Sequence, residues 1–313
     1  MPLSSVQKNE LVAIALDGVR FDERMAPHST IRIGGPVDAF VLPRDIETLK
    51  SVMRWAVESE IPHLFLGWGS DTLVRDGGVR GVVINTAQGF KRIEIACESG
   101  DDVFVTAESG VSTSTLVHFA TENSLSGVEG LAGIPGTVGG NIITNAGTSL
   151  GSISDVVDEI TIVDRQLKEL TIKRKALEFS YRRLKLPRST AVIRTLLKLR
   201  RGNCQEIKQK IGVFLEKRRQ TQPVGVLTLG CIFKNPQKDG KKSSSAGGLI
   251  DEAGLKEIRV GKARVSDVHA NFIINEGGAT ARDVEVLIGL IRERVKEKFG
   301  ILLEPEIHVV GEI

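Results

Sequence analysis

Aromatic side chains are scarce in this 313-residue chain, where Phe, Trp and Tyr together make up 4% of the residues and Tyr181 is the single tyrosine. Few rings are therefore available to stack on nucleic-acid bases. The formal net charge of +3 is also too small to indicate a nucleic-acid partner by itself. We expect no nucleic acid among the partners of this protein.

Cysteine is rare as well, since the chain has only Cys97, Cys204 and Cys231. An odd number of distant cysteines is typical of a reduced, cytoplasmic protein rather than of a disulfide scaffold. The opening MPLSSVQKNELVAIALDGVR has no basic segment followed by an apolar core, so no signal peptide is expected. No apolar run approaches the ~18 residues of a membrane span. The five histidines are scattered without zinc spacing, so no metal site is expected.

The length and composition indicate a globular protein with two domains. A chain of 313 residues exceeds the usual size of a single hydrophobic core. The hydrophobic content of 41% and charged content of 26% are ordinary for a globular fold. A shift in composition after a Lys- and Arg-rich segment predicts the domain boundary at 202–210.

A glycine-rich stretch, GVEGLAGIPGTVGGNIITNAG, covers 127–147, and seven of its 21 residues are glycine. Glycine lets the backbone approach a ligand closely. One interpretation is backbone wrapped around a flat or phosphorylated ligand, with N–H groups pointing inward. The other is a turn whose glycines only let two elements pack together.

A second glycine-containing segment follows a predicted strand at 63–66 and reads Gly67-Trp68-Gly69-Ser70-Asp71. It is a candidate phosphate cradle, because it combines backbone N–H groups with a hydroxyl donor. A tight hairpin is the alternative. The segment lacks the third glycine of a Rossmann fingerprint and the Gly-Lys-Ser/Thr of a Walker loop.

The apolar pattern predicts further elements along the chain. Residues 1–28 are expected to form a polar, partly helical lead-in, and 30–42 two short strands around Gly34 and Gly35. Helices are predicted over 46–60, 112–124, 205–219, 247–254 and 281–299. Strands are predicted over 63–66, 102–107, 157–163, 168–173, 191–200, 271–275 and 302–310, with one more ending near Ile84.

Three side chains and one basic segment are candidates for chemistry. Between Arg165 and Arg201 there are 13 Lys or Arg residues and two acids, which indicates either a solvated basic face or a field that attracts an anionic substrate. Cys231 could donate a proton or act as a nucleophile, or be a core residue. Arg182 could bind a carboxylate through two hydrogen bonds, or be a surface cation. Glu306 could be a buried functional acid, or face solvent by strand alternation.

Several ordered segments together resemble the UDP-N-acetylenolpyruvoylglucosamine reductase family. The resemblance runs from about Thr30 to the C-terminus and matches the shorter type, which lacks a tyrosine-bearing substrate loop. The segments that carry it are RIGGP, GWGSDTLVRDGGVRGVVI, GLAGIPGTVGGNIITNAG, Tyr181-Arg182, GCIFKNP, SAGGLIDEAGLK, VSDVHANFIIN and LEPEIHVVGE.

This resemblance implies an α+β fold with an FAD-binding domain of the vanillyl-alcohol-oxidase type and a smaller α+β substrate-binding domain. The implied FAD-binding region is 1–204, with a core at 30–202 and two subdomains split near 85, and the C-terminal strand 301–313 returns to it. The substrate-binding domain is then 205–300. The implied residues of the FAD loops are Gly67, Trp68, Gly69, Ser70, Asp71, Gly133, Ile134, Pro135, Gly136, Thr137, Gly139, Gly140, Asn145, Ala146 and Gly147.

The activity implied is reduction of UDP-N-acetylglucosamine enolpyruvate to UDP-N-acetylmuramate for peptidoglycan, and hence for cell-wall biogenesis, cell shape and cell division. NADPH supplies the hydride, non-covalent FAD transfers it to C3, and C2 is protonated. By the resemblance, Arg182 holds the substrate carboxylate, Glu306 lies beside it and Cys231 donates the proton. Residues that match positions near the sugar nucleotide are Tyr181, Lys234, Asn235, His269 and Asn271. We expect the protein to be a monomer.

The sequence departs from the family pattern at three places. Asp71 stands where asparagine is usual, Arg183-Leu184 replaces a usual serine, and Asn141 replaces a small residue. Two alternative functions stay open, namely another FAD-dependent carbohydrate oxidoreductase of the same fold and a non-catalytic protein that binds a flavin or a nucleotide sugar.

Overall fold

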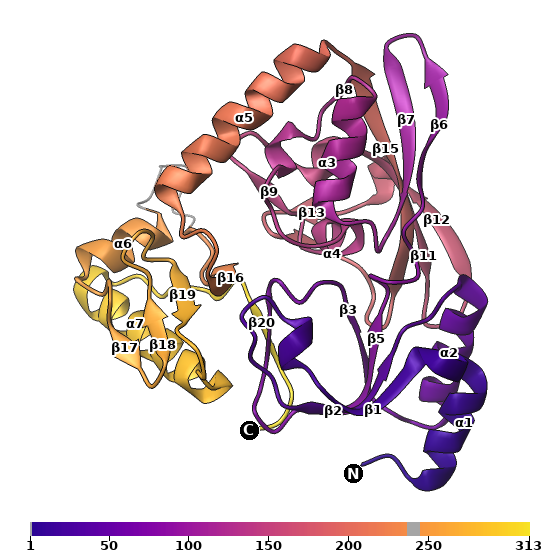
Figure 1. The fold of residues 1–313 in the computed structure, drawn as a ribbon, viewed down its shortest axis with the longest axis horizontal. Helices are drawn as coiled ribbons and strands as arrows, with labels where there is room; N and C mark the ends of the chain where they lie inside the picture. The colour runs from indigo at the N-terminus through magenta and orange to yellow at the C-terminus, as the bar shows by residue number, and fades with distance from the viewer. Residues whose placement is uncertain (1, 237–244) are drawn as a thin grey trace. The chain divides into compact units, whose positions relative to one another are not determined.

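The computed structural model describes residues 2–236 and 245–313 and divides into two compact units (Figure 1). Unit 1 comprises Met1–Phe21, Ala39–Trp68 and Gly81–Arg218. Unit 2 comprises Asp22–Asp38, Gly69–Arg80 and Arg219–Ile313. Helices and strands are mixed in both units, which confirms the predicted α+β class. No helix in the described ranges is both long and apolar enough to cross a membrane.

The main element of unit 1 is a six-stranded antiparallel sheet. Its strands, in spatial order, are β12 (Glu169–Lys173), β11 (Val157–Val163), β15 (Ala191–Arg201), β7 (Asp102–Glu108) and β6 (Ile93–Ser99), and β8 (Leu125–Ser126) also pairs with β15. Buried and more exposed residues alternate along β7, as a strand with one face on a core requires. Residues of α3 (Thr113–Glu122) and α4 (Val138–Ile143) share this core with the sheet.

A second core of unit 1 lies between two N-terminal helices and neighbouring strands. These helices are α1 (Ser5–Ala15) and α2 (Ile46–Glu58), and β3 (His63–Leu66) pairs in parallel with β5 (Val79–Asn85). The four-stranded sheet has the order β1 (Val19–Arg24), β2 (Pro36–Val41), β5, β3. Asp45 caps α2 by accepting a hydrogen bond from the Thr48 amide at 2.7 Å.

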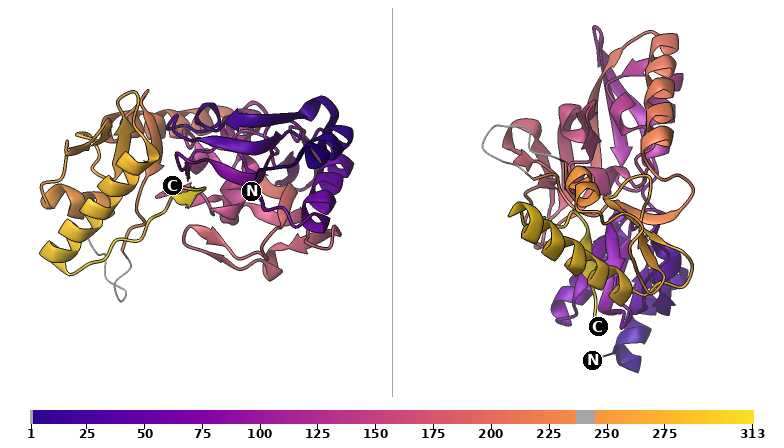
Figure 2. Two further views of the ribbon diagram at one scale, coloured as in Figure 1. Left: turned by 90° about the horizontal axis from the view of Figure 1, so that it is seen from below. Right: turned by 90° about the vertical axis from the view of Figure 1, so that its left-hand side faces the viewer.

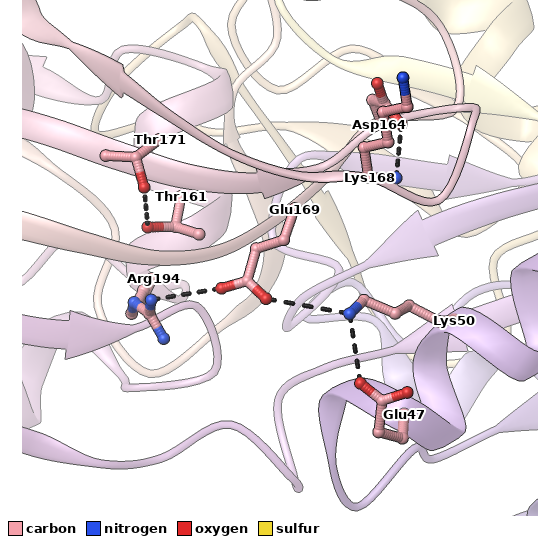
Figure 3. Close-up of polar contacts among 8 residues, drawn as sticks. All are labelled: Glu47, Lys50, Thr161, Asp164, Lys168, Glu169, Thr171 and Arg194. Carbon is pink, nitrogen blue, oxygen red and sulfur yellow. Dashed lines mark hydrogen bonds and ion pairs between the residues drawn. The ribbon is translucent and has the colours of Figure 1, made fainter.

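An ion-pair network links α2 to the large sheet within unit 1 (Figure 3). Glu169 of β12 accepts a hydrogen bond from Arg194 of β15 at 3.2 Å and lies 3.9 Å from the Lys50 ammonium of α2. Lys50 also pairs with Glu47 one helical turn away at 3.2 Å. Because these charges are partly exposed, each pair contributes only about 0.2–1 kcal/mol, and the network mainly orients the helix.

Unit 2 is built around a four-stranded antiparallel sheet covered by helices (Figure 2). The strands, in spatial order, are β16 (Leu227–Cys231), β19 (Phe272–Asn275), β18 (Ala263–Val265) and β17 (Arg259–Val260). The helices are α6 (Ala246–Glu252) and α7 (Ala281–Phe299), and their apolar faces share one core with the sheet. From the end of α7 the chain returns to β20 (His308–Val310), which pairs in parallel with β4 (Thr72–Val74).

The N-terminus of α7 is held by residues from a distant part of unit 2. Thr280 forms a capping box with Asp283. The carboxylate of Asp76 accepts hydrogen bonds from the amides of Ala281 at 2.9 Å and Arg282 at 3.1 Å. A negative charge at a helix N-terminus is favourable, because the first N–H groups carry a partial positive charge. The segment that carries Asp76 is therefore fixed to the helix although about 200 residues separate them in sequence.

Most predicted elements are confirmed, but three predictions were wrong in part. The strand β11 and the helix α7 have the predicted bounds. The final strand is limited to β20, and 30–35 contain no strand, because Arg32 and Gly34 adopt positive φ values of 58° and 150°. The lead-in contains the unpredicted strand β1 in addition to α1.

We predict that Asp76→Ala lowers the free energy of unfolding by about 1–2 kcal/mol, because two amides of α7 lose a charged acceptor. The measurement is thermal unfolding of the purified protein, where we expect the midpoint to fall by a few degrees. Asp101→Ala, which removes an exposed aspartate in the turn between β6 and β7, is the control and should leave the midpoint unchanged. Equal midpoints for the two variants would show that Asp76 does not stabilise the helix.

Candidate active site

The glycine-rich stretch lies across the core of unit 1 and is fixed through its backbone. The Gly136 carbonyl accepts hydrogen bonds from the amide and the hydroxyl of Thr113, at 3.0 and 3.2 Å. The amides of Val138 and Gly139 donate to the carbonyls of Val111 and Ser109, at 2.8 and 2.9 Å. A Cβ at Gly139 would lie 2.8 Å from the Ser109 Cβ, so only glycine allows this approach.

Asn141, one of the departures from the family pattern, is buried and stabilises this loop. Its Nδ2 donates to the Thr113 hydroxyl at 2.8 Å, and this hydroxyl in turn reaches the Gly136 carbonyl. Thr113 and Asn141 are thus positioning residues that the sequence did not reveal as such. The signal available in the sequence was a polar residue, Asn141, in a short helix that is otherwise apolar. Its partner, Thr113, lies 28 residues away and could not be identified from the sequence.

The two glycine-containing segments meet inside unit 1. A Cβ on Gly67 would lie 2.7 Å from the hydroxyl oxygen of Thr137. Thr137 is the N-cap of α4 and accepts a hydrogen bond from the Gly140 amide at 3.3 Å. The Gly67 carbonyl accepts a hydrogen bond from Nδ2 of Asn85 at 2.8 Å. The next residue, Trp68, leaves 46% of its surface exposed.

The remaining residues of the predicted loops occupy varied environments. Gly133 and Pro135 are exposed, Ile134 is half-buried, and Gly140 is exposed although it lies in α4. Ala146 is buried and donates to the Asn141 carbonyl at 2.8 Å. Gly147 begins the short strand β9 (Gly147–Thr148), which pairs with β10 (Gly151–Ser152). The stretch therefore combines buried, hydrogen-bonded residues with exposed residues, two of which are glycines.

Gly69, Ser70 and Asp71 belong to unit 2. A Cβ on Gly69 would lie 2.3 Å from the His28 carbonyl oxygen, and its φ is +60°. The carbonyl of Asp71 accepts a hydrogen bond from the His308 amide at 2.8 Å, and its carboxylate lies 3.3 Å from the Thr72 hydroxyl. Ser70 and Asp71 are half-buried.

The residues of unit 1 fit a large planar cofactor. The exposed residues of the 133–147 stretch are Gly133, Pro135, Gly140 and Ile143, so a flat ring can approach the backbone at the two glycines closely. Among the described residues, the Oδ1 atom of Asn145 is buried without a hydrogen-bond partner, which is a free acceptor in this stretch.

Arg182 lies in a tight hairpin of unit 1 formed by β13 (Phe179–Ser180) and β14 (Arg183–Leu184). Ser180 pairs with Arg183, so Tyr181 and Arg182 form a two-residue loop. The φ of Arg182 is +56°, and its guanidinium lies 5.2 Å from the centre of the Tyr181 ring. The hairpin is tied to the glycine-rich stretch, since Nδ2 of Asn145 donates to the Ser180 carbonyl at 2.9 Å.

Cys231 ends β16 in unit 2, where it lies opposite Phe272 in the register with β19. The segment that follows it is held by Asn271. The Asn271 carbonyl accepts from the Ile232 amide at 2.8 Å, and the Asn271 side chain exchanges two hydrogen bonds with the backbone of Phe233, at 2.9 and 2.8 Å. Asn271 is 3% exposed. Its buried amide therefore fixes the backbone next to the half-buried thiol of Cys231.

Glu306 approaches the same segment from the other side. Its amide donates to the Ile232 carbonyl at 2.7 Å, and the Lys234 amide donates to the Glu304 carbonyl at 2.9 Å. The Lys234 ammonium also pairs with the Glu304 carboxylate at 2.6 Å. The structure therefore brings Cys231, Lys234, Asn271 and Glu306 onto three adjoining backbone segments of unit 2.

His269 and Asn235 lie beside this cluster. Nδ1 of His269 accepts a hydrogen bond from the Asn271 amide at 3.2 Å, so the neutral ring carries its proton on Nε2. Burial lowers the pKa of His269 below its ordinary value. Oδ1 of Asn235 accepts from the Ala246 amide at 2.9 Å, at the start of α6.

Comparisons with known proteins identify the family. Residues 37–171 match the model of an FAD binding domain, and 222–310 match that of the UDP-N-acetylenolpyruvoylglucosamine reductase C-terminal domain. UDP-N-acetylenolpyruvoylglucosamine reductase of Geotalea uraniireducens is 40% identical over 97% of this chain and 98% of its own. The enzyme of an Anaeromyxobacter species is 42% identical over 93% and 88%. The chain belongs to this family.

A solved structure supports the same conclusion. The crystal structure of the Thermus caldophilus enzyme of this family matches with a TM-score of 0.77 and 33% identity, over 94% of this chain and 100% of that one. The fold predicted from the resemblance is confirmed as an α+β FAD-binding domain with a second α+β domain. The protein is an FAD-containing oxidoreductase.

We predict that Gly67→Ala destabilises the FAD-binding domain by about 1–3 kcal/mol, as overpacking does, because its methyl group would collide with a capping hydroxyl. The measurement is the temperature at which FAD is released, followed by flavin fluorescence. Gly212→Ala is the matched control, because this glycine lies in α5 (Cys204–Thr221) with no atom within 4 Å of a new Cβ. A release temperature that is unchanged in Gly67→Ala would contradict the close approach.

Proposed function

We propose that the protein reduces UDP-N-acetylglucosamine enolpyruvate to UDP-N-acetylmuramate in peptidoglycan precursor synthesis, with FAD as cofactor and NADPH as hydride donor. The observation that carries this proposal is the family membership over nearly the whole chain. When bound, FAD supplies the hydride carrier between NADPH and C3 of the enolpyruvyl group. The protein must then bind the substrate, stabilise negative charge at C2 and deliver a proton there.

We assign the carboxylate of the substrate to Arg182. A guanidinium presents parallel N–H donors that match a carboxylate and stabilise the enolate that develops beside it. The two-residue loop and the contact with Tyr181 support this role, because both limit the directions that the Arg182 side chain can take. Glu306 is assigned to the same carboxyl group by the family resemblance.

We assign the proton donor at C2 to Cys231, in its thiol form. A thiol is more acidic than a serine hydroxyl, so it can serve as a general acid. The hydrogen bonds of Asn271 and Glu306 to the backbone of Ile232 and Phe233 support this role, since they hold the segment after the thiol from both sides.

Four further side chains are proposed to serve the sugar nucleotide. Lys234 and His269 provide a cation and an Nε2–H donor, both suited to phosphate or sugar oxygens. Tyr181 is 41% exposed and provides a ring, and Asn235 is exposed. For Asn271, the two side-chain hydrogen bonds to Phe233 favour a positioning role over direct contact with the substrate.

We also propose a functional division that places FAD binding in 1–204, together with 301–313, and substrate binding in 205–300. The positions of the two matched family models, 37–171 and 222–310, support it.

We propose that the enzyme acts as a cytoplasmic monomer. Its three cysteines form no disulfide, which suits a reducing compartment. Size-exclusion chromatography with light scattering tests the monomer.

The function is tested by NADPH consumption with and without the enolpyruvyl sugar nucleotide. Consumption that depends on this substrate supports the proposal, whereas oxygen uptake with a simple sugar would indicate a carbohydrate oxidase. Turnover of neither would indicate a binding protein. Acid treatment should release the flavin and leave colourless protein, because no covalent link is proposed.

We predict that Arg182→Lys slows substrate reduction about 10- to 100-fold while flavin content and flavin reduction by NADPH stay close to wild type. Lysine keeps the charge but loses the two parallel donors, which corresponds to loss of a charged hydrogen bond. Stopped-flow absorbance separates the two half-reactions. Equal losses in both would remove Arg182 from the carboxylate site.

We predict that Cys231→Ala slows reoxidation of the reduced enzyme by substrate at least ~10²-fold, because the general acid is lost. Cys231→Ser is the matched control, since it restores a hydroxyl donor in nearly the same volume, and it should keep substantial activity. Flavin reduction by NADPH should be normal in both variants. If the alanine variant is reoxidised as fast as wild type, the proton comes from another group.

A further inference from the structure

The side chain of Asn145 links two parts of unit 1 that the proposed function keeps separate. Its Nδ2 donates to the Ser180 carbonyl, 35 residues further along the chain. A carbonyl oxygen only accepts hydrogen bonds, so this contact fixes which end of the amide is nitrogen. Asn145 thereby joins the glycine-rich stretch to the hairpin that carries Arg182.

Asn145 is itself held firmly at the end of α4. Its amide donates to the Ile142 carbonyl at 3.2 Å, and the next amide, of Ala146, donates to the Asn141 carbonyl at 2.8 Å. Its φ is +44°, a left-handed conformation that asparagine tolerates better than most residues. The side chain therefore starts from a fixed backbone position.

The other end of the same amide is free among the described residues. Oδ1 of Asn145 is buried and has no hydrogen-bond partner there. Buried acceptors are rarely left unsatisfied, so a ligand is the natural source of the missing donor. The stretch that contains Asn145 is the one whose exposed side fits a flat cofactor, and an oxidised flavin ring carries an N–H group.

The contacts of the hairpin itself lie mainly at its open end, where Leu184 packs in the core and Glu178 pairs with Lys185 at 2.8 Å. β13 and β14 are two residues long, and the loop between them places Arg182 at a φ of +56°. So short a ladder adds little to these contacts, because two paired strands without further packing are at best marginally stable. A hydrogen bond to the residue just before the loop is therefore well placed to set its direction.

We propose that Asn145 is a positioning residue that couples FAD binding to the placement of Arg182. In this role, Nδ2 anchors the hairpin through Ser180, and Oδ1 accepts a hydrogen bond from the bound cofactor. The arginine is thus oriented for the substrate carboxylate only where the flavin loop is in its loaded form. This inference rests on the proposed role of Arg182.

The simpler explanation is that Asn145 only ends α4. It accounts for the left-handed φ, but glycine would meet that need equally well. It does not account for the hydrogen bond to Ser180 or for the free acceptor at Oδ1.

The test compares Asn145→Gly and Asn145→Asp, both purified with FAD. Glycine suits the backbone and removes both ends of the amide. Aspartate keeps an oxygen at the position of Oδ1 but turns the donor toward Ser180 into an acceptor. Ser124→Gly, at another residue with a left-handed φ of +55° in unit 1, is the matched control.

Amide hydrogen exchange over 179–184 is the first measurement, and it does not depend on activity. We expect exchange to be about tenfold faster in both variants, as loss of one hydrogen bond predicts, and unchanged in Ser124→Gly.

The temperature of FAD release should fall further in Asn145→Gly than in Asn145→Asp, because only glycine removes the proposed acceptor. KM for the enolpyruvyl substrate should rise about tenfold in both variants.

Three outcomes would overturn the proposal. Unchanged exchange at 179–184 in both variants would show that Asn145 does not hold the hairpin. Faster exchange without a rise in KM would show that the hairpin does not serve the substrate. An FAD release temperature equal to wild type in Asn145→Gly would remove Oδ1 from the cofactor. Failure of the proposed function is a separate result, namely a wild-type enzyme that does not consume NADPH with this substrate while exchange and FAD release behave as expected.

Discussion

The close approach of Gly67 to Thr137 is the contact on which the proposed FAD site of unit 1 depends. It joins a loop carried by β3 to a loop carried by the large sheet, and no side chain fits between them. Asn85 fixes one side through the Gly67 carbonyl, and Thr137 fixes the other as the cap of α4. The site is therefore a product of backbone packing more than of particular side chains.

Regular elements were predictable from the sequence wherever one face is buried along their whole length. The helix α7 and the strand β11 have strong apolar patterns and were predicted at their observed bounds. The strand β6 was missed because none of its residues is buried and because Ala96 and Cys97 interrupt the apolar alternation after Ile95. The segment 302–307 was predicted as part of the final strand because of its apolar residues. In the structure it is not a strand, and it contacts the segment after Cys231 through single backbone hydrogen bonds to Ile232 and Lys234.

The candidate site was predictable as a set of residues but not as an arrangement. The resemblance implied Cys231 and Glu306 as site residues. The structure places both next to Ile232, Cys231 as its neighbour in sequence and Glu306 through a backbone hydrogen bond. The support from Thr113, Asn141 and Asn271 could not be predicted, because each binds a group of a residue distant in sequence. Asn141 departs from the family pattern, and its burial against Thr113 gives that departure a physical explanation.

The discontinuity of unit 2 has a consequence for how the chain folds during synthesis. Its core includes Ile31, Ile33 and Leu73, whose partners lie at 229–307. On the ribosome, these apolar side chains emerge long before the residues that cover them, so the nascent chain carries an unpaired apolar surface through most of translation. Contacts of such sequence separation slow folding and favour aggregation of incomplete chains. Chains truncated before α7 should therefore depend strongly on chaperones, even though all of unit 1 has already been made.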